Sequence, residues 1–237
     1  MTVTRATRRT TAAALALALP LALGALASSA SADTPDPVDP PDTFTSAFVV
    51  DATPGNVIGP DNTTPSGGDP DGSGEFLFFL NTEGDNEIIC WDITTENVEP
   101  PYQSMAKTAT HIHQTPAGTN GPPRIAFPNP TGPDGSDIRT SSGCSEGPFT
   151  TGLQANGQDT GTGFSLEAIE ANPAGFSADT HTSTAVPGAV RGQLVFSQEL
   201  LDQANGVDEE PGDDDGGVDD GAGAGGGDDD REVPVNG

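Results

Sequence analysis

A series of short segments rich in β-branched and aromatic residues dominates the middle of this chain. Turn-forming runs such as SGGDPDGSG and PAGTNGPP separate them. Short segments at this spacing are typical of antiparallel sheets, so the pattern predicts an all-β sandwich or barrel. The segments that we expect to be strands are 44–51, 75–81, 86–94, 107–114, 124–127, 176–183 and 188–196.

Two local patterns refine this prediction. TEGD lies between the second and third expected strands and predicts a hairpin in which Gly84 adopts a positive φ. The segment SLEAIEANP (165–173) instead has apolar residues at helical spacing. Ser165 is a candidate N-cap, and Asn172-Pro173 ends the pattern, so we predict one short helix here.

Both ends of the chain differ from its middle. Residues 1–32 combine arginines, the apolar run AAALALALPLALGALA and small residues ending at Ala32. This order predicts a signal peptide cleaved after Ala32, and Arg8-Arg9 leaves twin-arginine export open beside the general secretory route. The rest divides into a Pro/Asp-rich linker (33–43), one folded domain (44–200) and a disordered acidic Gly/Asp-rich tail (201–237).

The charge balance restricts the partners. The chain has 36 Asp and Glu residues against 8 Lys and Arg, a formal net charge of −28. Loss of three arginines with the signal peptide changes this from −28 to −31. Such a chain repels nucleic acid and anionic membranes, so we expect no nucleic-acid partner. No second long apolar run follows, so we expect a secreted, extracellular chain without a transmembrane anchor.

The chain has two cysteines, Cys90 and Cys144. An even number of cysteines in an exported protein favours a disulfide, and with two cysteines the pairing is fixed. A metal-binding role is the alternative.

Two of the three histidines lie in THIHQ, as His111 and His113, and the third is His181. Residues i and i+2 of a strand point to the same face, so His111 and His113 should project together. A third imidazole from a neighbouring strand would complete a pocket for zinc or copper. The alternative is structural: the rings bond loop carbonyls and each other, and so fix the turn PAGTNG.

Three motifs in order, ATHIHQTPAGTNGPP, EAIEANPAGFSADTHT and PGAVRGQL, resemble the CHRD (chordin-type) domain family over roughly residues 44–197. The resemblance implies a secreted β-sandwich module, and all three histidines lie in these motifs. The motif residues with an expected structural role are Asn120, Gly121, Arg191 and Gly192. The growth-factor ligand of the animal members is not expected here.

The closing motif carries one of the few basic residues. Arg191 should pair with a carboxylate such as Asp179 or Glu167, or cap loop carbonyls. Gly192 indicates a close approach of two backbone segments within the sheet.

No nucleophile elbow or phosphate-binding glycine loop is present in the sequence. We therefore expect a non-catalytic protein without a cofactor: an antiparallel β-sandwich, immunoglobulin-like or Greek-key, with one short helix. The expected role is extracellular or cell-envelope binding or adhesion with an unidentified ligand. The alternative role is copper or zinc binding through His111, His113 and His181, with an activity at that metal as a further variant.

Overall fold

The computed structural model describes residues 38–62, 64–84 and 86–207. The predicted signal peptide, the start of the predicted linker and most of the predicted tail lie outside these residues. Among the described residues, no helix is both long enough and apolar enough to cross a membrane.

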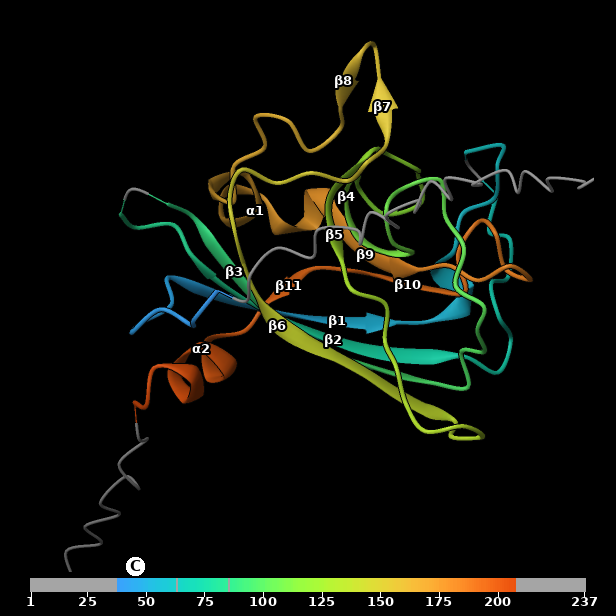
Figure 1. Cartoon of the computed structure of the whole chain (residues 1–237), viewed down its shortest axis with the longest axis horizontal. Helices are drawn as coiled ribbons and strands as arrows, with labels where there is room; N and C mark the ends of the chain where they lie inside the picture. The colour runs from blue at the N-terminus through green and yellow to red at the C-terminus, as the bar shows by residue number, and fades with distance from the viewer. Residues whose placement is uncertain (1–37, 63, 85, 208–237) are drawn as a thin grey trace, which may run out of the picture. The chain divides into compact units, whose positions relative to one another are not determined.

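Most strands belong to two antiparallel sheets (Figure 1). The first sheet has the order β11-β1-β2-β3-β6, with β1 (Ser46–Ala52), β2 (Ser73–Asn81), β3 (Ile88–Glu96), β6 (Ile138–Glu146) and β11 (Val195–Phe196). The second has the order β10-β9-β4-β5, with β4 (Thr110–Gln114), β5 (Pro123–Phe127), β9 (Phe176–Thr180) and β10 (Val190–Gln193). The remaining elements are the ribbon β7 (Gln154–Ala155) and β8 (Gln158–Asp159), the helices α1 (Glu167–Ala171) and α2 (Gln198–Ala204), and the 3-10 turns η1 (Pro54–Asn56) and η2 (Pro173–Gly175).

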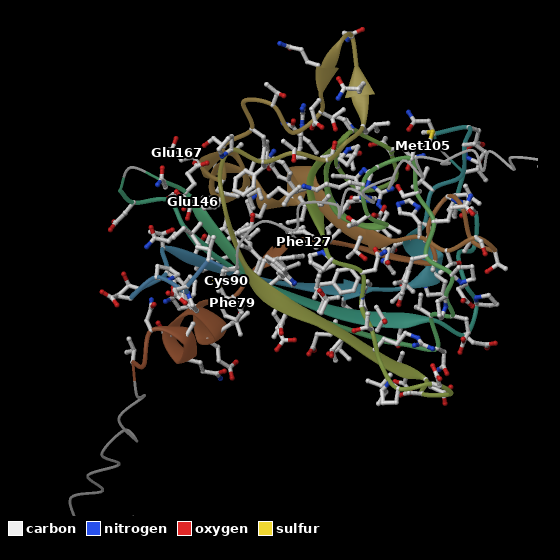
Figure 2. All side chains as sticks on the ribbon, viewed as in Figure 1. Phe79, Cys90, Met105, Phe127, Glu146 and Glu167 are labelled. Atoms are coloured by element: carbon white, nitrogen blue, oxygen red, sulfur yellow. A yellow bond between two sulfur atoms is a disulfide. The ribbon has the colours of Figure 1, made fainter. Side chains whose placement is uncertain are left out.

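The hydrophobic core lies between the two sheets. In β2, the alternate residues Phe76, Phe78 and Leu80 are fully buried, as the period-two pattern of a half-buried strand requires. Phe127 of the second sheet, labelled in Figure 2, packs its ring 5.2 Å from that of Phe78 and 5.2 Å from that of Trp91 in the first sheet. These contacts between facing sheets confirm the predicted antiparallel β-sandwich.

One chain segment joins the sheets along an edge. β10 pairs with β9 in the second sheet, and β11, which follows directly, pairs with β1 in the first. The crossing brings the β10 backbone close to the end of β1. A Cβ at Gly192 would collide with the Asp51 carbonyl and lie 2.7 Å from Val50 Cγ1. The structure thus explains why glycine stands here, as the sequence indicated.

Six of the seven predicted strands are present, with ends that differ by up to three residues, and β2 and β3 form the predicted hairpin, with Gly84 at φ 98°. The seventh, predicted as one strand over 188–196, is divided into β10 and β11, which belong to different sheets. The predicted helix is α1, but it begins at Glu167 and Ser165 is not its N-cap. Ser165 Oγ instead accepts the Glu167 N–H and donates to Glu87.

Two longer elements were not predicted. β6 pairs with β3 along nine residues, and the predicted Cys90–Cys144 disulfide joins these two neighbouring strands. The helix α2 runs to Ala204, so the segment that we expected to be tail from residue 201 begins as helix. Its Asn205 side chain bonds both the N–H and the carbonyl of Phe44, which holds α2 beside the start of the domain.

Candidate metal centre

Strands β4, β9 and β10 place the candidate site on the second sheet, on the side opposite the core. Ile112, between His111 and His113, is fully buried in the core, so both histidines point to the other side. The strand register sets Asp179 opposite His111 and Arg191 opposite Asp179. Three neighbouring strands therefore carry an imidazole, a carboxylate and a guanidinium in one row.

The three histidines converge on Asp179. Its Oδ1 atom lies 3.2 Å from His113 Nε2 and 3.2 Å from His181 Nε2. The same oxygen lies 3.7 Å from His111 Nδ1. The four atoms all lie within 4.8 Å of one another. We refer to these four residues as the histidine–aspartate cluster.

The second ring nitrogen of each histidine contacts a backbone carbonyl. The contacts are His111 Nε2 to Thr108 at 2.7 Å, His113 Nδ1 to Gly121 at 2.8 Å and His181 Nδ1 to Val186 at 2.9 Å. A carbonyl oxygen only accepts, so these nitrogens carry the proton and, in a neutral ring, the opposite nitrogen presents a lone pair to Asp179. Metal-bound histidines are oriented by the same kind of contact.

The converging atoms lack hydrogen bonds. Within the described part of the chain, His111 Nδ1, His113 Nε2 and Asp179 Oδ1 are buried and have no hydrogen-bond partner. The 3.2 Å contacts are therefore close approaches without hydrogen-bond geometry. The lone pair of a neutral ring and a carboxylate oxygen aimed at the same point repel each other, and a positive charge there, a proton on a ring or a bound cation, would turn the repulsion into attraction.

Burial and charge act against each other on the pKa values. Burial alone would raise the pKa of Asp179, but the charges of His113 and His181 hold it well below its usual value. Burial alone would lower the pKa of His181, but the Asp179 carboxylate raises it to about 9. For His111 burial prevails, and its pKa is lowered. In the metal-free chain at neutral pH, the cluster thus holds a proton at His181.

Asp179 is the member of the cluster that sequence reasoning missed. It was considered only as a partner for Arg191. Two signals point to it: Asp179 and His181 are two residues apart, and carboxylates are common metal ligands beside imidazoles. The register between β4 and β9, which brings Asp179 to His111, is not visible in the sequence.

Arg191 does not form the predicted ion pair within the described residues. The pKa of its guanidinium is lowered, because burial outweighs the opposite effect of the negative charge of Asp179 on the neighbouring strand. Within the same part of the chain, Arg191 also forms no ion pair with Glu167. The guanidinium donates instead to three neutral groups: Ser177 Oγ, Asn120 Oδ1 and the Thr119 carbonyl. The bond to the Thr119 carbonyl agrees with the alternative expectation that Arg191 caps loop carbonyls, whereas Ser177 lies in β9 and Asn120 accepts through its side chain.

The NGP turn supports the cluster from one side. A Cβ at Gly121 would collide with the Gln114 carbonyl, so the turn can come close to β4 only with glycine. The Gly121 carbonyl then accepts from His113. Asn120 donates to the carbonyls of Ile58 and Gly59. The motif residues Asn120, Gly121 and Arg191 are thereby gathered around the histidines.

Two cavities border the cluster. One, of about 330 Å³, is lined by the three histidines and by apolar side chains that include Met105, Leu153 and Val186. The other, of about 360 Å³, is lined by His113, Asp179, His181 and Arg191, with an apolar wall of Ile58, Pro60, Val186 and Pro187. Met105, labelled in Figure 2, is 85% exposed and lines the first cavity together with the histidines.

The fold and this site define an antiparallel β-sandwich protein with three histidines and an aspartate gathered on one sheet. The model of the CHRD domain family matches residues 48–194, and the chain belongs to this family. The match includes all four cluster residues and confirms the resemblance seen in the sequence. No curated protein and no solved structure matched the chain.

Proposed function

We propose that this chain is an exported metal-binding protein that holds one zinc or copper ion in the histidine–aspartate cluster. One observation carries the proposal: buried ligand atoms of His111, His113 and Asp179 face a common point without hydrogen-bond partners. Buried polar atoms in native proteins are almost always satisfied, so such a group needs an explanation, and a bound cation supplies one.

The donor set supports zinc or copper over other ions. Imidazole nitrogen suits zinc and copper, whereas magnesium and calcium take oxygen ligands. Bonds of about 2.0–2.1 Å in a tetrahedron place ligand atoms roughly 3.3 Å apart. The oxygen–nitrogen distances of 3.2, 3.2 and 3.7 Å are close to this spacing. The carbonyl contacts of all three rings supply the orientation that such a site needs.

The number of protein ligands supports a non-catalytic role. Structural zinc sites have four protein ligands, and catalytic sites keep one position open. With three histidines and Asp179 as ligands, the ion would join β4 to β9 and to the segment after it. Binding of a further extracellular or envelope ligand stays a prediction, for which the site offers no separate observation.

The proposal is tested by titrating zinc and copper into untagged protein against a competing chelator. We expect one site per chain, lost in His113→Ala and in His181→Ala. Gln158→Ala, an exposed change on β8, is the matched control and should bind as the wild type does. A purely structural role for the histidines predicts a different result. The wild type would bind no metal, and each histidine variant would lose the same amount of thermal stability whether or not metal is added.

A further inference from the structure

The histidine–aspartate cluster has a charge imbalance once a metal ion is bound. The ion brings two positive charges and Arg191 a third, while Asp179 supplies one negative charge among the groups lining the 360 Å³ cavity. Arg191 is 4% exposed, and the hydrogen-bond acceptors of its guanidinium, on Ser177, Asn120 and Thr119, are neutral. A buried excess of positive charge is costly unless an anion compensates it.

The guanidinium retains capacity for such an anion. Toward the residues that the structure describes, Arg191 uses three of its five N–H groups in the bonds above, one on each nitrogen, which leaves one on Nη1 and one on Nη2. Both outer nitrogens belong to the planar fork that matches a carboxylate. The same cavity has an apolar wall, formed by Ile58, Pro60, Val186 and Pro187. A polar end and an apolar wall together fit a small organic acid.

We propose that the cavity beside Arg191 binds a small carboxylate, with its charged end at the guanidinium and its alkyl part against the apolar wall. The inference rests on the proposed metal site, because the ion creates the excess charge. The anion does not need to be a metal ligand. It acts through its charge, and by linkage the carboxylate and the metal ion then strengthen each other's binding by the same factor.

The test uses the full chain and measures zinc affinity with free zinc fixed by a chelator in every buffer. Acetate, propionate and butyrate are compared with chloride at equal ionic strength. In wild type we expect about 50 mM acetate to strengthen zinc binding by about threefold or more. Propionate and butyrate should act at lower concentrations, by up to about fourfold per added methylene.

Two variants locate the effect. Arg191→Lys keeps the charge and removes the fork, so the gain from acetate should shrink while zinc still binds. Because Arg191 is buried, folding of this variant is checked by thermal melting. Pro60 is exposed and lines the same cavity, so Pro60→Phe narrows the cavity from its surface side, and Pro60→Ala, which also removes the proline ring, is its control. We expect the phenylalanine variant to bind zinc normally and to lose the preference for longer acids.

The outcomes separate the two proposals. If wild type binds zinc equally in chloride and in all three carboxylates, the carboxylate site is wrong and the metal site stands. If sulfate at equal ionic strength acts as acetate does, the effect is general anion screening, and the carboxylate site is again wrong. If wild type binds neither zinc nor copper in any buffer, the metal site itself fails.

Discussion

Asp179 connects the chemistry of the three histidines to the rest of the sheet. It lies between His111 on β4 and Arg191 on β10, and it supplies the one negative charge of the cluster. Asp179→Asn keeps the shape and removes this charge. We expect zinc affinity to fall about tenfold or more. Chelator competition measures it, with Asp92→Asn, an exposed change on β3, as control; equal affinities in both variants would rule out Asp179 as a ligand.

The metal-free protein should lose stability on the alkaline side. Asp179 raises the pKa of His181 from 6.5 to about 9 in the folded state. A raised folded pKa gives a contribution that is complete below about pH 6.5 and is lost as pH rises toward 9, at most about 1.4 kcal/mol per pH unit. His111, whose pKa is lowered, is already neutral in this window. Denaturant unfolding of chelator-treated protein measures the fall.

A matched variant identifies the group behind that fall. His181→Gln removes the titrating ring, so its stability should be flat between pH 6.5 and 9. A fall of the same size in the variant would assign the pH dependence to another group.

For the individual residues, the sequence predicted part of the site. The strand period places His111 and His113 on one face, and the family motifs include all three histidines. The fourth ligand and the neutral partners of Arg191 depend on which residues face each other across β4, β9 and β10. That register is set by long-range pairing, which a single sequence does not display.

Among the elements, the segment from β10 to β11 depends on a close approach to β1 at Gly192. Gly192→Ala places a methyl group against the Asp51 carbonyl and Val50, both part of β1. We expect a loss of about 2 kcal/mol or more in the free energy of unfolding, because backbone must move. Gly55→Ala is the control, since a Cβ there has no heavy atom within 4 Å. Equal stability of the two variants would contradict the close approach.

The strands that the sequence revealed are those with a buried face. In β2 the buried residues alternate, and the pattern is readable. β6 (IRTSSGCSE) lies at the edge of its sheet and has one buried position, Ser141, so no apolar period marks it. Cys144, however, did predict the link to Cys90 that this strand makes. α2 was missed because its short QELLDQA pattern precedes the Gly/Asp-rich segment.

At the scale of the whole molecule, the fold concentrates the distinctive residues in one region. The family match spans residues 48–194 and contains the whole cluster, whereas the acid-rich segment from residue 208 lies outside the described residues. A chain with net charge −28 attracts cations generally, so the metal site must be distinguished from nonspecific binding. Loss of binding in single histidine variants, which keep all 36 acidic residues, makes that distinction.

Export is a prediction at this scale as well. The apolar run and the small residues before Ala32 predict that the mature chain begins at Asp33. Terminal sequencing of protein from the culture medium checks this. Intact Met1 on protein that stays within the cells would contradict it.

The metal content of untagged protein, purified from the native secreted fraction without chelators, tests the metal site most directly. Elemental mass spectrometry should find about one zinc or copper ion per chain, lost in His113→Ala. Protein without either metal, even after both have been offered at neutral pH, would contradict the metal site and leave the histidines with a structural role.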